Sequence, residues 1–74
     1  MEIDIKKIKE TYVKGMRIRL IKMDDIQAPP VGTEGTVLGV DAIGSIMVEW
    51  DNRSRINVVL EVDSVEIIPR IEDK

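Results

Sequence analysis

The change of hydrophobic period at Met16 constrains this chain most. From that residue on, apolar residues alternate with polar ones or form short β-branched runs, in five segments separated by turn-forming residues. Alternation with period two is typical of half-buried β-strands, and short β-branched runs are typical of strands as well. The five expected strands lie within MRIRL (16–20), GTVLGVD (35–41), SIMVEWD (45–51), RINVVLEV (55–62) and SVEIIP (64–69).

The connections between these segments indicate how they are arranged. Turn-forming residues recur about every ten residues, which predicts hairpin connections and an antiparallel sheet rather than alternating strands and helices. One connection, Asp24–Glu34, is long and joins the first two strands. We therefore expect a mainly β protein, with a small five-stranded antiparallel barrel over residues 16–69 and a flexible tail at residues 70–74.

The segment IDIKKIKETYVKG (3–15) has helical rather than strand spacing. Ile5, Ile8 and Tyr12 are three and four residues apart with lysines between them, which predicts a short α-helix with one apolar stripe and a stop at Gly15. A helix of about ten residues is marginal by itself. Residues 1–15 are therefore expected either to dock this stripe on the barrel or to form a flexible arm.

Composition excludes most catalytic chemistry. The chain has 74 residues, enough for one domain with a small core, and it contains neither cysteine nor histidine. Disulfides, thiolate ligands and the commonest general base are thus excluded, and no serine has a histidine to activate it. We expect a non-enzyme with no catalytic residue and no cofactor.

Metal and membrane sites are not expected either. The calcium-loop template, counted from Asp51, would need oxygen ligands at positions that Arg53 and Arg55 occupy. Asp24 and Asp25 are expected to shape a turn rather than to bind a metal. No apolar run approaches the roughly 20 residues of a membrane-spanning helix, so we expect a cytoplasmic protein that binds no membrane.

Charge is unevenly distributed along the chain. Met1–Lys22 carries a net charge of +4 and Met23–Lys74 a net charge of −7. A basic front could bind a polyanion, or it could complement the acidic remainder within the fold. The second interpretation is favoured, because an acidic body repels phosphates near any basic strip.

The loop QAPPVGTEGTV (27–37) is explained by backbone geometry alone. Pro29 and Pro30 each fix φ and lack an N–H donor, so the loop is stiff. Gly32 and Gly35 are expected to adopt positive φ, or to form a bulge where the chain re-enters the sheet. No ligand is needed to account for this composition, although binding there stays open.

The same loop carries a resemblance to known families. A long connection followed by GTEGTV and a hairpin resembles SH3-like barrels, including the KOW relatives of ribosome- and transcription-associated proteins. The stretches MRIRLIKMDD, APPVGTEGTVLGVD, GSIMVEWDN and VD (62–63) together resemble the bacterial domain-of-unknown-function family 4314. Its members are small proteins often carried by phage-like and conjugative elements. The resemblance covers residues 12–68 and implies an SH3-like barrel, but no established role.

The chain departs from that family pattern at two places. Arg53 stands where the family usually has glycine, so a simple Asn-Gly hairpin is absent and Asn52 is expected to supply the positive φ. Leu60 and Glu61 stand where relatives tend to have a proline-glycine turn. The fourth strand is therefore expected to run longer here.

The first functional hypothesis is a protein–protein adaptor of a phage or mobile element. It would bind through the loop Asp24–Gly32 and the hairpin tip Asn52–Ser54. Trp50 is in register with Ile46 and Val48, which favours a core position, but an exposed indole would be the best anchor. The candidate partner-binding residues are Asp24, Asp25, Gln27, Pro29, Pro30, Trp50, Asn52 and Arg53.

The alternative is nucleic-acid binding by a basic strand and helix face, as in KOW-like domains. Against it, Arg17 and Arg19 are expected to pair across strands with acidic neighbours such as Glu66. The chain also lacks aromatic side chains interleaved with these cations. The candidate residues for this alternative are Lys6, Lys7, Lys9, Lys14, Arg17 and Arg19.

Two apolar runs exceed what one face of a strand can bury. In Val58–Leu60 and in Ile67–Ile68, some side chains must lie opposite the barrel core. The favoured cover is the N-terminal helix. The other interpretation is a homodimer or partner surface near Val59 and Ile68.

Overall fold

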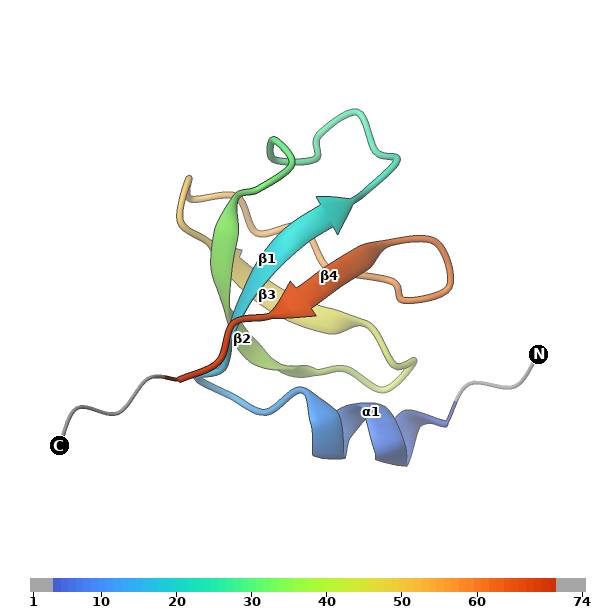
Figure 1. The fold of residues 1–74 in the computed structure, drawn as a ribbon. Coiled ribbons are helices and arrows are strands. Elements are labelled where there is room, and N and C mark those ends of the chain that lie inside the picture. The colour runs from blue at the N-terminus through green and yellow to red at the C-terminus, as the bar shows by residue number, and fades with distance from the viewer. Residues whose placement is uncertain (1–3, 71–74) are drawn as a thin grey trace, which may run out of the picture.

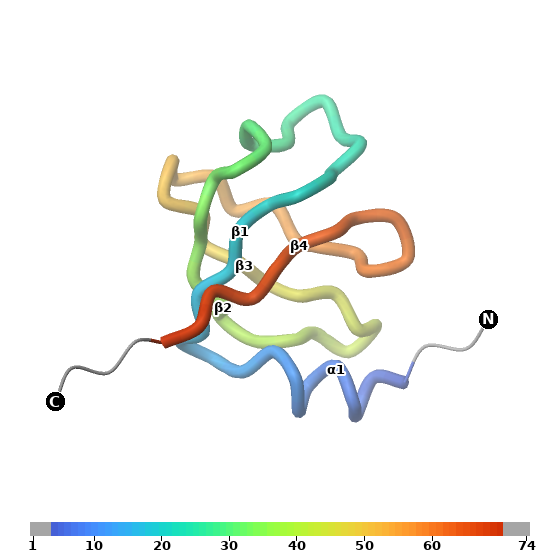
Figure 2. Tube along the Cα trace, viewed as in Figure 1, coloured from blue at the N-terminus to red at the C-terminus, as the bar shows by residue number. Residues whose placement is uncertain are grey.

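The computed structural model describes residues 4–70. One short helix precedes four strands, and the strands curl around a small core (Figures 1 and 2). The parts of the expected N-terminal arm and C-terminal tail at residues 1–3 and 71–74 lie outside the described residues. The elements are α1 (Ile5–Thr11), β1 (Arg17–Lys22), β2 (Glu34–Val40), β3 (Ile46–Trp50) and β4 (Ser64–Ile67).

The four strands form one antiparallel sheet in the order β3-β2-β1-β4. The mainly β class and the short N-terminal helix are confirmed, whereas the sheet is open and has four strands instead of the expected five within residues 4–70. Because the chain alternates direction, the β1–β2 loop lies at one end of the sheet and the β2–β3 hairpin at the other (Figure 1).

The fifth strand, expected over residues 55–62, is reduced to a single bridge. Val58 and Ile46 exchange two backbone hydrogen bonds of 2.8 and 2.9 Å. The chain then turns at once, because the carbonyl of Val59 accepts the N–H groups of Val62 and Asp63 and the Asp63 carboxylate accepts the N–H of Val59. The expected lengthening of this strand through Leu60 and Glu61 is therefore wrong.

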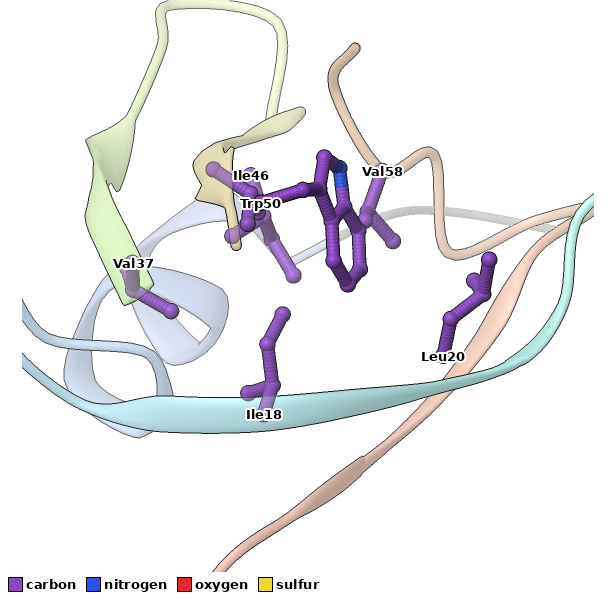
Figure 3. Close-up of a cluster of buried hydrophobic side chains, with 7 residues drawn as sticks. Ile18, Leu20, Val37, Ile46, Trp50 and Val58 are labelled. Atoms are coloured by element: carbon purple, nitrogen blue, oxygen red, sulfur yellow. The ribbon is translucent and has the colours of Figure 1, made fainter. Parts of the chain in front are cut away.

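The core is built from inward-facing residues of β1, β2 and β3 together with Val58 of the isolated bridge (Figure 3). Trp50 is 1% exposed, and its indole Nε1 donates a hydrogen bond of 3.0 Å to the carbonyl of Ile56. The ring is thus buried with its one polar atom satisfied, which confirms the core position and removes Trp50 from the surface anchors. The fully buried side chains are Ile18, Leu20, Val37, Ile46, Val48, Trp50 and Val58.

The two glycines of the β1–β2 connection have different roles. Gly32 has φ of +95°, as expected for a turn. Gly35 lies inside β2 without positive φ, which corrects the expectation for that residue. A Cβ on Gly35 would stand 2.8 Å from the ring of Trp50 and 2.8 Å from a methyl group of Val48, so packing of the core requires glycine there.

Helix α1 is short and docked. The Asp4 side chain accepts the N–H of Lys7 at 3.1 Å and caps the helix, as aspartate at this position commonly does. Ile8 and Tyr12 pack against the core, so the docked form of the helix is confirmed for its described residues. The helix ends at Thr11, before the expected stop at Gly15, which instead forms a turn with φ of +92°.

Candidate interaction surfaces

The outer face of the sheet carries a ladder of alternating charges. Arg17 donates hydrogen bonds of 2.9 and 2.7 Å to the two carboxylate oxygens of Asp51 and one of 3.2 Å to Glu34. Arg19 pairs with Glu34 at 3.4 Å and with Glu66. We call this set the charge ladder; it comprises Asp51, Arg17, Glu34, Arg19 and Glu66.

Strand register explains why these side chains meet. Arg19 lies directly opposite Glu34 on β2 and Glu66 on β4, so the three side chains share one face. The bidentate bond to Asp51 raises the pKa of Arg17, and the bond from Arg17 lowers the pKa of Asp51. The favoured interpretation, in which these arginines pair with acidic neighbours, is confirmed.

The charge ladder weakens the hypothesis that β1 binds phosphates. Two guanidinium groups meet three carboxylates, so the set carries a net negative charge. Arg17 and Arg19 are therefore not available as free cations on the strand face. Within residues 4–70, every ion pair uses an arginine, and the lysines of the N-terminal segment are exposed: Lys6, Lys7, Lys9 and Lys14.

The proline loop, residues 24–32, is held by its own hydrogen bonds. The Asp25 carboxylate accepts the N–H of Gln27 at 2.8 Å, and the Asp25 carbonyl accepts the N–H of Ala28 at 3.0 Å. At its far end, the N–H of Gly32 donates to the carbonyl of Leu20 at 2.8 Å. The loop thus has a defined shape, as its prolines predict.

Pro29 and Pro30 face different surroundings. Pro29 is buried and anchors the loop on the body of the protein, which corrects its placement among the partner-binding candidates. Pro30 is exposed, as are Asp24, Asp25 and Gln27. Four of the five candidates on this loop are therefore accessible.

Two accessible side chains on the proline loop were not among the predicted site residues. Ile26 is fully exposed (101%), and Val31 is 71% exposed. Both are large apolar side chains in a loop whose other exposed members are polar, glycine or proline. The sequence offered one signal of their exposure. Both residues lie in a turn-forming segment, where no hydrophobic period assigns a side chain to the core.

The tip after β3 lies at the same end of the sheet as the proline loop (Figure 1). The N–H of Asp51, which precedes this tip, donates a hydrogen bond of 2.9 Å to the carbonyl of Glu34, the first residue of β2. Asn52 and Arg53 are exposed there. The positive φ belongs to Arg53 (76°) and not to Asn52, which corrects the expectation; the Asn52 side chain instead accepts the N–H of Ser54.

An apolar groove lies at the opposite end of the molecule, between α1, the β2–β3 hairpin and the turn that follows Val58. It has a volume of about 620 Å³. We call it the helix groove. Its apolar lining is Ile8, Tyr12, Ile43, Val59 and Leu60, and its polar or small lining is Asp4, Lys7, Thr11, Gly44, Ser45 and Glu61.

A second groove, of about 650 Å³, runs along the end of β4. Ile68 lines it, whereas Val59 lines the helix groove, so the two apolar runs of the sequence face separate surfaces. The homodimer surface predicted near Val59 and Ile68 stays a prediction. The second groove is lined by Val13, Lys14, Gly15, Met16, Arg17, Ile67, Ile68, Pro69 and Arg70.

Among residues 4–70, no group of three or more acidic side chains is placed to hold a metal ion. Ser45 is buried in the β2–β3 hairpin, where the Asp41 carboxylate accepts its N–H at 2.9 Å. The same part of the chain contains no helix with the length and apolar character needed to cross a membrane.

These observations define a small, mainly β protein with an open antiparallel sheet and a docked N-terminal helix. It has two separate apolar surfaces, the helix groove and the exposed side chains of the proline loop. The family model for a domain of unknown function, DUF4314, matches residues 1–68, so the chain belongs to that family. The suspected family is thereby confirmed. Neither a curated protein nor a solved structure matches the chain.

Proposed function

We propose that this protein is a non-catalytic protein-binding module whose contact surface is the proline loop together with the tip Asn52–Ser54. The observation that carries the proposal is the complete exposure of Ile26 on a loop held by internal hydrogen bonds. An apolar anchor with polar neighbours is the usual composition of a protein-binding hot spot.

The rigidity of the loop strengthens this proposal. Binding through a flexible loop must offset the entropy lost when the loop becomes ordered. Here the turn around Asp25 and the buried Pro29 already hold the loop, so less entropy is lost on contact. The exposed polar groups of Asp24, Gln27 and Asn52 would form a hydrated rim.

Charge favours a protein over a nucleic acid as the partner of this surface. Asp24 and Asp25 flank Ile26, and the charge ladder neutralises the strand arginines. A phosphate backbone would meet net negative charge at both places. The exposed lysines of residues 4–14 favour nucleic acid instead, and nuclease treatment separates the two outcomes.

The test is affinity capture from a lysate of the bacterial host, with and without nuclease, followed by mass spectrometry. The wild type and a Val62→Ser control should capture the same nuclease-resistant partner in stoichiometric amount, because Val62 is 61% exposed and lies outside the proposed surface. The Ile26→Ser/Val31→Ser variant should lose it, and Gln27→Ala/Pro30→Ala should weaken it. Capture that vanishes with nuclease would transfer the function to nucleic acid.

The finer fold and setting are part of the same proposal. An SH3-like architecture is supported by the curled sheet (Figure 1) and by the bridge between Ile46 and Val58, in the segment where a fifth strand was expected. A phage or mobile-element setting is proposed only because the resemblance to this family implies it.

A further inference from the structure

We propose that the second groove receives the acidic proline loop of another copy of this chain. The groove lies where the end of β4 meets the start of β1, and the loop follows the other end of β1 (Figure 1). Because the length of β1 separates the two surfaces, they can meet only between two molecules. A contact between different surfaces of identical chains builds open chains or a closed ring.

The charged lining of the second groove is cationic. Lys14, Arg17 and Arg70 line it, and no carboxylate among the described residues does. Arg17 is already bonded to Asp51 and Glu34 within the charge ladder. Lys14 and Arg70 are exposed and form no ion pair with the described part of the chain, so two uncompensated positive charges remain at the groove.

The proline loop carries the opposite charge. Asp24 and Asp25 are exposed, and neither forms an ion pair with a residue that the structure describes. Residues 23–33 contain no cation. Two free carboxylates on the loop therefore complement two free cations at the groove, and added salt should weaken the contact.

The helix groove is the poorer receptor for this loop. Its charged lining is Asp4 and Glu61 against Lys7, so it would repel an acidic segment. Charge thus directs the loop to the second groove, at the other side of the α1–β1 connection.

Apolar surface is available on both sides of the proposed contact. At the second groove, Val13 is 47% exposed and Ile67 is 41% exposed. On the loop, Ile26 is fully exposed and Val31 is 71% exposed. The groove volume of about 650 Å³ exceeds the need of one side chain, so a loop tip with its neighbours has room there.

Two cations near the loop supply an internal check. Lys22 at the end of β1 and Arg53 on the tip after β3 are exposed at the loop end of the sheet, and they limit its attraction to a basic groove. Lys22→Gln/Arg53→Gln should therefore strengthen self-association severalfold. Lys14→Gln/Arg70→Gln removes the same net charge and should weaken it, so a general effect of net charge cannot produce both results.

The deciding experiment is sedimentation velocity of full-length variants from micromolar to millimolar concentration. The wild type should associate progressively, and the groove variant Lys14→Glu/Arg70→Glu should associate at least about tenfold more weakly. Lys6→Glu/Lys9→Glu is the matched control, because these lysines are exposed and line neither groove. It should behave like the wild type. Circular dichroism with thermal unfolding checks that each variant folds.

A mixture of two variants tests which surfaces meet. The loop variant Asp24→Lys/Asp25→Asn reverses the charge of the loop and keeps an acceptor for the N–H of Gln27. Alone it should be as weak as the groove variant. In the mixture, the acidic groove meets the basic loop and the unchanged groove meets the unchanged loop, so association should return.

Three results would each overturn the proposal. They are a wild type that stays monomeric at millimolar concentration, a Lys6→Glu/Lys9→Glu control as weak as the groove variant, and a mixture without recovery.

The inference goes beyond the proposed function and shares with it only the accessible proline loop. The groove variant should lose self-association and still capture the lysate partner, because the second groove lies at the other end of β1. Self-association that is absent while capture persists would refute the groove contact alone. Capture that is absent while self-association persists would refute only the external partner.

Discussion

At the residue scale, two positions show how backbone geometry and packing constrain single side chains. Arg53 adopts positive φ, which is unfavourable for any residue with a Cβ. Gly35 lacks such a φ and is required by the ring of Trp50 instead. Glycine at position 53 should therefore raise the stability of the fold, whereas alanine at position 35 should lower it.

Arg53→Gly should stabilise the protein by about 0.5–1 kcal/mol, because glycine adopts the left-handed conformation without the Cβ clash. Part of that gain is offset by the greater freedom of glycine in the unfolded chain. Urea unfolding measures the change. Arg53→Ala is the matched control and should show no gain, since alanine retains the Cβ; an equal gain from alanine would contradict the explanation.

Gly35→Ala should destabilise the protein by about 1–3 kcal/mol, the usual range for an overpacked core. The added Cβ would stand 2.8 Å from Trp50 and from Val48, so one of them must move. Denaturant unfolding of a double-mutant cycle with Val48→Ala provides the check. The second substitution should cost less in the Gly35→Ala background, and strict additivity would argue against the clash.

At the scale of the elements, local signals located each strand and the helix but did not determine their ends. Alternation placed β1 and β3 correctly, with Ile18 and Leu20 on the core face of β1. The segment after β3 became a bridge and a turn because the Asp63 carboxylate caps the N–H of Val59. That side-chain hydrogen bond competes with strand pairing, and the hydrophobic pattern of the sequence does not predict it.

Helix α1 depends on its cap because it has only seven residues. Asp4→Ala should destabilise the protein by about 1 kcal/mol, since the N–H of Lys7 loses its acceptor. Asp4→Asn keeps an acceptor and should lose much less. Thermal unfolding of both variants makes the comparison, and equal losses would show that the charge of Asp4 matters more than its hydrogen bond.

At the scale of the whole molecule, the charge ladder spans the sheet from β4 to the end of β3. The side chains of its pairs are 38–54% exposed, and ion pairs this accessible to solvent contribute little individually. Their main consequence is electrostatic, because they neutralise the basic front of the chain with the acidic remainder. The charge asymmetry of the sequence is thus partly resolved within the fold.

The ladder makes stability depend on acidity in a defined direction. The bond from Arg17 lowers the pKa of Asp51 from its ordinary value of 3.8, so this carboxylate stabilises the fold fully above its unfolded pKa. The contribution is lost as the pH falls through the lower folded pKa. Urea unfolding at a series of pH values should show Asp51→Asn less stable than the wild type near neutrality, with a gap that closes below about pH 4.

Asp24→Asn is the control for that experiment. Asp24 is exposed on the proline loop and forms no ion pair with the described residues. Its substitution should produce no comparable gap. An Asp51→Asn gap of constant size through the acid range would mean that the asparagine acts through packing rather than through charge.

The sequence by itself determined the β class, the helix, the family and the pairing of the strand arginines, because hydrophobic period and charge alternation act between near neighbours in the chain or sheet. Only the tertiary structure decided that Pro29 is buried while Ile26 is exposed, and that α1 forms a groove with Ile43 and Leu60. Burial in a loop and the shape of a groove depend on segments distant in sequence, whose meeting no local pattern encodes.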